Sequence, residues 1–556
     1  MDKTRYIPLI EQAGDYLFFL RPRRFGKSLW LGTLEAYYDV LNKDKITTIF
    51  KNTWIADNLT PEAGNYLILR FNFSMVDPNP SRVEESFNET CLQSIEDFVF
   101  KYREILPGEL QNKLLSYKKA DRVLKSLLSP STFKEIQHKL YVLIDEYDNF
   151  TNTILSEYSS STYHEITHGS GFLRYFYNIL KGATTGPNAP LAKIFITGVS
   201  PITMDDVTSG FNIGTPITLY PQFNELAGFT QEDVKRIFEY YIDVGWLNQP
   251  IEKLIEIAST WYNSYKFDGY SSVFLYNPDM IFYFIREVGT YKRIPDILID
   301  DNVKMDYTKL KYLVIIDRKF NGNFSVLQKV MDKGAIISPI LTSFPLESLL
   351  KQSHFISHLF YLGILSFKDK DILNIPNQTV WNILFEYLRN IYEDLDIFRL
   401  DIFDLQHMLR DMAYLGRWYD VFKFLSKEIE KQGSIRDFIT GESSIKILQA
   451  AYLNITKYFT VKTETELNKG FADIYLEPFW ERDENVKYGY LIEIKYVPRS
   501  KKLTDEHLSQ LRNKAKEQLE QYSKDIRISE KFSSDPEKRL IKIYQIWYGW
   551  EMVEIG

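Results

Sequence analysis

The chain has 556 residues, of which 45% are hydrophobic, 25% charged and 15% aromatic, and its formal net charge is -7. This composition is typical of a soluble globular protein with about three domains. The acidic balance excludes a uniformly basic nucleic-acid coat protein but allows a local basic groove. The one cysteine, Cys91, excludes an internal disulfide and a zinc site built on cysteines, which favours a cytoplasmic location. We expect neither a signal peptide nor a membrane span, because the polar start and the short apolar runs fit neither.

The first half of the chain, residues 1–290, alternates short apolar runs with segments of helical period, which predicts an α/β fold with a parallel sheet. Each apolar run ends in turn or polar residues, as strands of such a sheet do. Helices are expected at Ser86–Arg103 and Phe172–Lys181. The expected strands are Tyr16–Leu20, Tyr66–Phe71, Tyr141–Asp145 and Lys193–Thr197.

A Gly-Lys-Ser sequence lies between the first expected strand and a helical segment, which is the context of a phosphate-binding loop. Gly26 lets the backbone approach a phosphate closely, Lys27 would reach the β- and γ-phosphates, and Ser28 would hold Mg²⁺. The usual loop begins with glycine, and here that position is Arg21. The alternative is therefore a surface turn rich in arginine.

Two later strand ends favour the nucleotide site over the surface turn. Asp145 and Glu146 follow a buried-type strand, where the first acid would support Mg²⁺ and the second would polarise the attacking water. Thr197 ends another strand and could sense the γ-phosphate if that strand lies between the other two. The alternatives are a solvated acidic pair and a simple strand cap. The combination of the three segments predicts an ATP site.

The loop Arg21-Pro22-Arg23-Arg24-Phe25-Gly26-Lys27-Ser28 resembles that of the AAA-ATPase-like family, which also lacks the leading glycine. The resemblance covers about residues 1–290 and implies ATP binding and hydrolysis. Asn263-Ser264 departs from the glycine that the family often has there. Further matching segments are Asp2-Lys3-Thr4, Asp145-Glu146-Tyr147-Asp148, Thr197-Gly198, Gly228-Phe229-Thr230, Trp261-Tyr262, Tyr265 and Tyr276-Asn277-Pro278.

The middle of the chain is expected to be mostly helical. Thr230, followed by Gln231, Glu232 and Asp233, has the pattern of a helix start. We expect an ATPase core at residues 1–221, a helical lid at 222–290 and a helical or winged connector at 291–400. Arg23 and Arg24 are candidates for binding the nucleotide itself or a phosphate held by a neighbouring subunit, and the second option corresponds to a homo-oligomer.

A second candidate site lies in the C-terminal domain, expected at residues 401–556. Alternation at Tyr488–Tyr496 sets Glu493 and Lys495 on one face of a strand, and Asp473 on a neighbouring strand could meet Glu493 across a metal ion. Such a metal would activate water and stabilise a phosphodiester transition state, with Lys495 adding positive charge. The alternative is an ordinary cross-strand ion pair.

This arrangement is similar to that of PD-(D/E)XK nucleases, whose restriction-endonuclease-like α/β domain commonly follows an AAA-ATPase-like domain. The resemblance implies that Asp473 and Glu493 are metal ligands and that Asp473, Glu493 and Lys495 are catalytic, with Glu442 and Gln518 as further members. Phe471 stands where the family usually has arginine. Residues 495–545 contain 13 Lys or Arg and 8 Asp or Glu, a net of +5, which fits a phosphate backbone or a solvated helix face.

The sequence therefore predicts an enzyme with two activities, ATP hydrolysis and cleavage of nucleic acid. The catalytic candidates are Glu146, Asp473, Glu493 and Lys495. The expected cofactors and partners are ATP, Mg²⁺ or Mn²⁺, and DNA or RNA, with no membrane. The alternative is an ATP-gated switch or scaffold whose nuclease-like domain binds but does not cut. The nucleotide and metal candidates at the first site are Arg23, Arg24, Gly26, Lys27, Ser28, Asp145 and Thr197.

Overall fold

The computed structural model describes residues 1–134, 136–157, 160–168, 171–186, 188–203, 213–307, 314–316, 319–320, 322–533 and 535–556. The chain forms two compact units that each combine separate stretches of sequence. The first comprises Met1–Val234, Ser264–Asp279 and Ser338–Ile372, and the second comprises Lys235–Asn263, Met280–Ile337 and Leu373–Gly556. The four consecutive domains expected from the sequence remain a prediction. The two units are defined by packing, and each combines stretches that are not consecutive in the sequence. Among the described helices, none combines the length and apolar composition needed to cross a bilayer.

The first unit contains a parallel five-stranded sheet, as the sequence predicts. Its strand order is β2-β3-β4-β1-β5. Strand β4 pairs in parallel with β1 on one side and with β3 on the other, which confirms the expected placement of the Lys193–Thr197 run between the other two motif-bearing strands. The bounds are β1 (Tyr16–Leu20), β2 (Tyr66–Asn72), β3 (Lys139–Asp145), β4 (Leu191–Gly198) and β5 (Thr215–Pro216).

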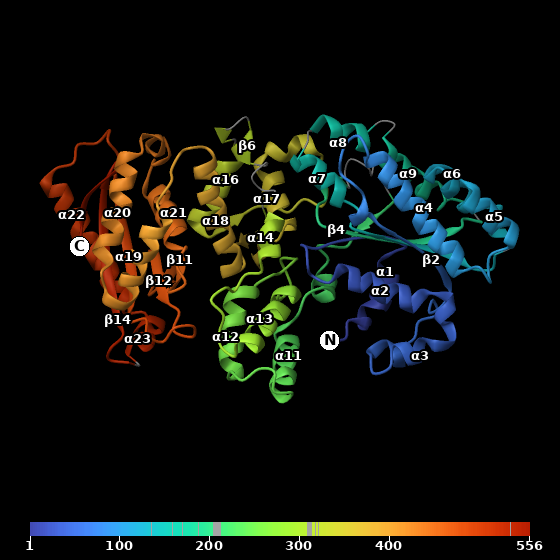
Figure 1. Ribbon diagram of the computed structural model, residues 1–556, viewed down its shortest axis with the longest axis horizontal. Helices are drawn as coiled ribbons and strands as arrows, with labels where there is room; N and C mark the ends of the chain where they lie inside the picture. Colours follow the sequence, from blue (N-terminus) through green and yellow to red (C-terminus); the bar gives the residue numbers. More distant parts are fainter. Residues whose placement is uncertain are drawn as a thin grey trace. The chain divides into compact units, whose positions relative to one another are not determined.

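Helices lie on both faces of this sheet because its central strands are buried apolar runs with two faces to cover. Helix α2 packs against β2, β3 and β4, and α4 packs against β2. Figure 1 shows α2 below the sheet and α4 and α9 above it. The helices of this part are α1 (Ile7–Ala13), α2 (Lys27–Tyr38), α3 (Ile46–Ile49), α4 (Val83–Lys101), α5 (Gly108–Ser116), α6 (Ala120–Leu127), α7 (Asn149–Glu157), α8 (Ser160–Thr167) and α9 (Phe172–Gly182).

An aromatic cluster fills the space between β2 and the helices above it. The ring of Phe176 lies 5.3 Å from that of Phe71 and 5.5 Å from that of Phe87, both in edge-to-face geometry. Phe73 and Phe150 extend the same cluster. Edge-to-face pairs add about 0.5–1.5 kcal/mol each to the stabilisation from burial, so this cluster fixes α9 and α7 against the sheet.

The middle of the chain begins with the helix that the sequence predicts after Thr230. The Thr230 hydroxyl accepts from the Asp233 backbone N–H at 3.2 Å, and the Asp233 carboxylate accepts from the Thr230 N–H at 3.1 Å. This reciprocal capping satisfies donors that the helix itself leaves unpaired. The elements here are α11 (Gln231–Asp243), α12 (Ile251–Tyr262), α13 (Pro278–Tyr291), α14 (Asp301–Tyr307), β6 (Ile315–Ile316), β7 (Lys319–Phe320), α16 (Gly322–Lys333), β8 (Ala335–Ile337), α17 (Gln352–Tyr361), β9 (Ser366–Asp369), β10 (Ile372–Asn374) and α18 (Gln378–Asp394).

The C-terminal part of the second unit contains a mixed five-stranded sheet of order β11-β12-β13-β14-β15. Strands β13 and β14 are parallel, and the other neighbours are antiparallel. The strands are β11 (Phe459–Leu467), β12 (Gly470–Pro478), β13 (Tyr488–Val497), β14 (Arg539–Tyr548) and β15 (Glu551–Ile555). The helices are α19 (Ile402–Leu415), α20 (Trp418–Lys431), α21 (Glu442–Leu453), α22 (Asp505–Ser523) and α23 (Ile526–Ser533).

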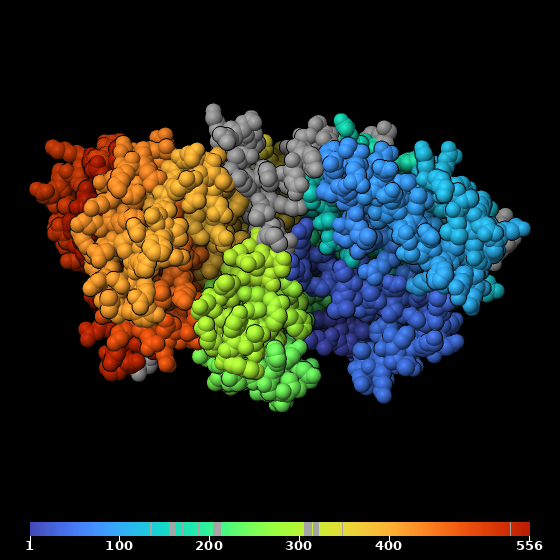
Figure 2. Space-filling view, viewed as in Figure 1, coloured from blue at the N-terminus to red at the C-terminus, as the bar shows by residue number. Residues whose placement is uncertain are grey.

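Both faces of this second sheet are covered. On one face, Leu491 of β13 and Tyr475 of β12 share an apolar core with Leu519 of α22. On the other face, the Tyr490 hydroxyl donates to the Met412 carbonyl of α19 at 2.7 Å. Helices α19 and α20 form the orange surface turned toward the viewer in Figure 2. The alternation of β13 therefore assigns Glu493 and Lys495 to the α22 face.

A substitution at Gly198, the last residue of β4, tests how tightly the end of this strand is packed. A Cβ added at Gly198 would lie 2.3 Å from the ring of Tyr147 and 2.4 Å from a carboxylate oxygen of Asp148. Because Tyr147 is fully buried, we expect Gly198→Ala to lower the free energy of unfolding by about 1–3 kcal/mol through overpacking. Chemical denaturation of the full chain, monitored by circular dichroism, measures this change.

Gly182→Ala is the matched control for this substitution. Gly182 ends α9, and no atom lies within 4 Å of the place that a Cβ would occupy there. Alanine at this position should leave stability unchanged or raise it by up to about 1 kcal/mol, because alanine has the higher helix propensity. Equal stability of the Gly198→Ala protein and the parent would contradict the packing described for the end of β4.

Candidate functional sites

The first candidate site is the loop between β1 and α2. The backbone of Gly26 has φ 92°, a left-handed conformation that favours glycine, although no atom lies within 4 Å of a Cβ built there. Helix α2 begins at the next residue, Lys27, and the exposed Ser28 follows it. The loop thus presents an exposed helix N-terminus, whose unpaired N–H groups and positive dipole end favour phosphate.

Arg21, which occupies the position of the usual leading glycine, is fully buried. Its guanidinium donates to the carbonyls of Leu20, Thr218 and Phe223 at 3.0, 3.0 and 2.7 Å. The same group lies 4.4 Å from the ring centre of Phe19 and 4.1 Å from that of Phe267. Arg21 therefore anchors the start of the loop to the 218–224 segment and is not directed toward a phosphate.

The Lys27 ammonium closes the loop on itself. It donates to the carbonyl oxygens of Arg21 and Pro22 at 3.1 Å each, and the side chain is buried. Burial lowers the pKa of Lys27, while the carboxylates of Glu146 and Asp145 act in the opposite direction. The Lys27 ammonium is thus enclosed by the loop and bonded to two of its carbonyl oxygens.

The expected acids and hydroxyl come together at the carboxyl ends of β3 and β4. The Thr197 hydroxyl donates to Asp145 at 2.8 Å, and both residues are buried. Glu146 follows in a left-handed conformation with φ 52°, and burial raises its pKa while Lys27 opposes the rise. The structure therefore places Lys27, Asp145, Glu146 and Thr197 around one point, which the strand order of the sheet requires.

Arg23 and Arg24 are each held by a polar partner. Arg23 donates to the Asn149 side chain at 3.0 Å. Arg24, with φ 67°, forms an ion pair with Asp279 at 2.8 Å. Asn149 and Asp279 both belong to the first unit, so these two contacts hold the loop against other parts of its own unit.

Sequence reasoning missed Arg70 at this site and gave Asp148 no role of its own. Arg70 of β2 lies 3.6 Å from Asp145, on the side opposite Thr197's strand, and 3.3 Å from Glu35 of α2. A charge inside the apolar run Tyr66–Phe71 was the available signal. Asp148 accepts from the backbone N–H groups of Val199 and Ser200, so it holds the chain as it leaves β4.

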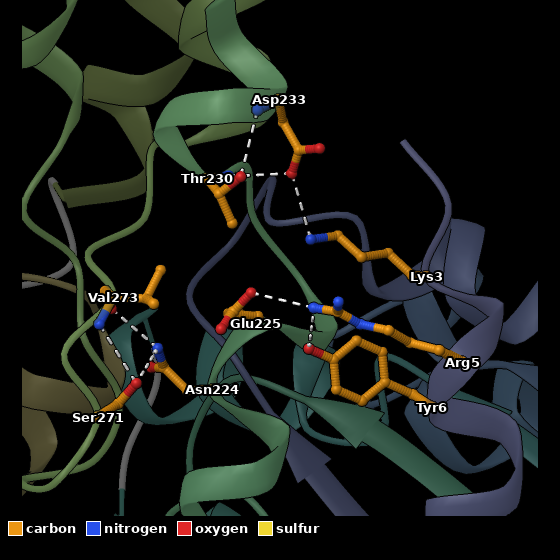
Figure 3. A network of polar contacts seen from close by, with 9 residues as sticks. All are labelled: Lys3, Arg5, Tyr6, Asn224, Glu225, Thr230, Asp233, Ser271 and Val273. Atoms are coloured by element: carbon orange, nitrogen blue, oxygen red, sulfur yellow. Dashed lines mark hydrogen bonds and ion pairs between the residues drawn. The ribbon is translucent and has the colours of Figure 1, made fainter.

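Segments of the first unit that lie far apart in the sequence meet in a network of polar contacts (Figure 3). Lys3 forms an ion pair with Asp233 at 3.4 Å, and Arg5 forms one with Glu225 at 3.2 Å. Gly228, with φ 97°, donates its N–H to the Phe25 carbonyl at 3.2 Å. The two ion pairs therefore join the chain start to the 225–233 segment, and Gly228 of that segment holds the loop through Phe25.

Aromatic packing also holds the loop in place. The Phe25 ring lies 5.0 Å from Tyr265 and 5.3 Å from Phe267, edge-to-face in both cases. Gly363, with φ 79°, would bring a Cβ to 2.9 Å from Pro22. Tyr265 and Gly228 lie in two of the segments that resemble the AAA-ATPase-like family. Their contacts with Phe25 help to fix the shape of the loop.

The second candidate site lies between β12 and β13. Their pairing ends with Ile474 opposite Ile492, and continuing this antiparallel register by one residue sets Asp473 opposite Glu493. There the Asp473 carboxylate accepts from the Ile494 backbone N–H at 2.7 Å. A side chain thus takes the place of a strand carbonyl, which fixes Asp473 at the end of the ladder.

Glu493 and Lys495 share one face of β13, as alternation predicts, and contact each other. The Lys495 ammonium donates to Oε1 of Glu493 at 2.5 Å. Oε2 of Glu493 is buried without a hydrogen-bond partner. The exposed fractions are only 6% for Asp473, 2% for Glu493 and 7% for Lys495, so the three groups form an enclosed polar cluster.

Electrostatics mark Asp473 and Glu493 as a strained pair. Burial and then the charge of Glu493 raise the pKa of Asp473 well above its usual value. Burial raises the pKa of Glu493, and Lys495 opposes that rise. Burial alone would lower the pKa of Lys495, but Glu493 raises it. An orphaned carboxylate oxygen beside a second carboxylate is an arrangement that a divalent cation would neutralise.

Glu442 and Gln518 also lie at this cluster. Glu442 begins α21, and burial raises its pKa while Lys495 opposes the rise. Gln518 of α22 donates to the Tyr522 hydroxyl at 3.0 Å, and its own oxygen is buried without a partner. Among the described residues, no group of three or more His, Cys, Asp or Glu has the geometry to hold a metal ion by itself.

Two neighbouring residues complete the description of the site. Phe471, at the expected arginine position, is 54% exposed, so it supplies no charge to the cluster. Lys446 of α21 is buried and pairs with Asp332 at 2.7 Å and with Glu464 of β11. Lys446 therefore ties α21 to the sheet, a contact that the sequence did not indicate.

Comparison with known proteins gives two family matches in separate parts of the chain. Residues 1–208 match a family described as predicted AAA-ATPase, and residues 440–555 match the PD-(D/E)XK nuclease superfamily. The chain is 26% identical over 314 residues to the "Uncharacterized protein in vnfD 5'region" of Azotobacter chroococcum mcd 1. That alignment covers 54% of this chain and 52% of the relative, so the chain spans about half of the relative's length.

A solved structure also matches part of the chain. The Walker-type ATPase PabY2304 of Pyrococcus abyssi is 13% identical, with a TM-score of 0.40 over 69% of this chain and 94% of that protein. The two family matches confirm the resemblances noted from the phosphate loop and from the Asp473, Glu493 and Lys495 set. The chain therefore combines a segment similar to the predicted AAA-ATPase family, residues 1–208, with a segment similar to the PD-(D/E)XK nuclease superfamily, residues 440–555.

Proposed function

We propose that this protein binds and hydrolyses ATP in its first unit and cleaves nucleic acid with its C-terminal domain. The observation that carries the first activity is the meeting of the Lys27 loop with Asp145, Glu146 and Thr197 at one edge of the parallel sheet. Ligands of such sheets bind outside the carboxyl ends of the strands, and ATP would bind at this edge.

In this proposal each residue at the first site has a separate task. The α2 N-terminus and Lys27 bind the phosphates, and the two loop carbonyls now held by Lys27 release it to phosphate oxygens. Ser28 and Asp145 hold Mg²⁺, and Glu146 orients the attacking water. Thr197 reports the γ-phosphate through its hydrogen bond to Asp145.

The second activity rests on the orphaned oxygen of Glu493 opposite Asp473, with Lys495 alongside. Asp473, Glu493 and Lys495 fit a divalent cation, Mg²⁺ or Mn²⁺. The two carboxylates supply hard oxygen ligands, and the single lysine charge does not neutralise both of them. When bound, the metal would polarise a phosphodiester and activate a water molecule. Asp473 and Glu493 hold the cation, and the Lys495 ammonium stabilises negative charge that develops on the phosphate.

The alternative function is an ATP-gated switch whose nuclease-like domain binds nucleic acid without cutting it. The near-complete burial of Asp473, Glu493 and Lys495 favours this alternative, because a scissile phosphate must reach these groups. Whether the substrate is DNA or RNA is left to the assays below. The single, buried Cys91 supports a reducing compartment, and we assign the protein to the cytoplasm.

For the ATP site, we expect Lys27→Ala to weaken ATP binding about 100-fold, because a charged hydrogen bond to phosphate contributes about 1.5–3 kcal/mol. Glu146→Gln should retain ATP binding and lower turnover by about 10²–10⁴-fold, because only water activation is lost. Calorimetry measures binding, and phosphate release measures turnover.

Glu109→Gln, at an exposed position of α5, is the matched control for the Glu146 substitution and should leave turnover unchanged. Turnover at the parent rate in both Lys27→Ala and Glu146→Gln would show that ATP is hydrolysed elsewhere or by a contaminant.

For the nuclease site, Asp473→Ala and Glu493→Ala should each abolish cleavage while ATP hydrolysis continues, because the substitutions leave the first unit intact. Lys495→Ala should lower the cleavage rate about 100-fold through loss of charge stabilisation. This variant should still gain thermal stability from Mn²⁺ without nucleotide, since both carboxylates remain. Lys542→Ala, an exposed lysine on the neighbouring β14, is the control.

Two outcomes separate the nuclease from its alternatives. If the parent binds nucleic acid with ATP but never cuts it under any metal condition, the ATP-gated switch is the correct function. If the Asp473→Ala, Glu493→Ala double variant cuts as fast as the parent, the observed nuclease does not reside at this site.

A further inference from the structure

A cluster of exposed arginines stands on one half-buried tryptophan in the C-terminal domain. The guanidinium carbon of Arg436 lies 5.0 Å from the ring centre of Trp550, and that of Arg499 lies 4.7 Å from it. Arg499 also lies 4.5 Å from the ring of Tyr548. Stacking on an aromatic face holds a guanidinium in place while its N–H groups remain free at the edge, which is the geometry that binds phosphate.

The turn between β14 and β15 holds Arg499 in this position. Gly549, with φ 59°, forms that turn and donates its N–H to the Val497 carbonyl at 2.9 Å. A Cβ at Gly549 would lie 2.7 Å from Cγ of Arg499. The arginine stem therefore packs in space that only glycine leaves open.

Positive side chains outnumber carboxylates in this cluster. Arg499 forms an ion pair with Glu551 at 2.6 Å. Arg436 donates to the Glu430 backbone carbonyl at 2.8 Å, an uncharged partner. Lys501 and Lys502 follow Arg499 in the same connection and are exposed. Arg436, Arg499, Lys501 and Lys502 stand here with Glu551, which pairs with Arg499, and with the exposed Asp437, which is next to Arg436 in sequence; four cations and two carboxylates give these side chains a net charge of +2.

Both arginines lie a few residues along the chain from elements that carry the nuclease-like cluster. Strand β13 carries Glu493 and Lys495 and ends at Val497, two residues before Arg499. Arg436 precedes Glu442, whose carboxyl group interacts electrostatically with Lys495. Lys495, which contacts Glu493, precedes Arg499 by four residues, and four residues of extended chain span about 13 Å, over which one nucleic-acid strand carries about four phosphates. A strand cleaved at Glu493 would therefore pass the arginine cluster.

We propose that Arg436, Arg499 and Trp550 form a phosphate clamp that binds the backbone of nucleic acid next to the cleavage site. The inference rests on the proposed nuclease function and names the residues that hold the substrate. Trp550 is the platform, the two guanidinium groups bind successive phosphates, and Lys501 and Lys502 extend the track. Contacts of this kind position nucleic acid without reading its sequence.

The test is binding of fluorescent single-stranded DNA, duplex DNA and RNA to the full chain in EDTA, where metal-dependent cleavage cannot occur. Arg436→Ala and Arg499→Ala should each weaken binding about tenfold, and each should reduce the slope of log affinity against log salt by about 0.7–0.9. Trp550→Leu should weaken binding although every positive charge remains, and Trp550→Phe should restore it. These substitutions should leave ATP hydrolysis unchanged.

Arg410→Ala is the matched control, because Arg410 is an exposed arginine near an aromatic ring, 5.6 Å from that of Tyr414, in the same domain. It should change neither affinity nor salt slope. Unchanged nucleic-acid binding in the Arg436→Ala, Arg499→Ala double variant would overturn the clamp. Loss of binding by the double variant supports the clamp even if the parent never cuts, and failure of cleavage then counts only against the nuclease proposal.

Discussion

The position of β4 between β1 and β3 is the constraint on which the N-terminal site depends. Parallel pairing on both sides brings the ends of three strands to one edge of the sheet. The Lys27 loop follows β1, while Asp145 and Thr197 lie at the ends of β3 and β4, so residues far apart in the sequence become neighbours. The close packing of Gly198 against Tyr147 keeps the edge compact. Arg21 then connects the loop to the segment after β5 through its hydrogen bond to the Thr218 carbonyl.

The C-terminal site depends on a different constraint, the enclosure of like charges. Asp473 and Glu493 stand opposite each other in a setting that raises the pKa of both, and one lysine cannot neutralise two carboxylates. Burying charges without full compensation costs stability, and such strain is common where a protein binds a cation or substrate. Arg436 and Arg499, by contrast, are exposed and positively charged. A surface that would attract phosphate therefore accompanies the carboxylates that would bind the metal.

The sequence predicts most of what is encoded locally. Helix α22 begins where its local sequence directs, because Thr504 caps it and acids occupy its first turn. Glu493 and Lys495 share a face because strand periodicity allows no other result. The strand order of the first sheet also follows from the motifs, since a phosphate loop, an acidic pair and a hydroxyl can act together only at one edge.

Contacts between distant segments could not be predicted in this way. The carbonyl partners of Arg21 at Thr218 and Phe223 lie about 200 residues further along the chain, and no local pattern identifies them. The same holds for Arg70 beside Asp145 and for Trp550 between two arginines. The orphaned oxygen of Glu493 is a property of three-dimensional packing, because the spacing of residues gives the side of a strand but not the partners of each atom.

The central claim is that one chain combines an ATP site with a metal-dependent nuclease. Incubation of the full chain with plasmid DNA, single-stranded DNA and RNA, with and without ATP and with Mg²⁺, Mn²⁺ or EDTA, tests it most directly. We expect that at least one of these substrates is cleaved, that cleavage requires the divalent metal, and that its rate changes when ATP is present. Absence of cleavage of all three substrates under every condition, in protein that hydrolyses ATP, would contradict it.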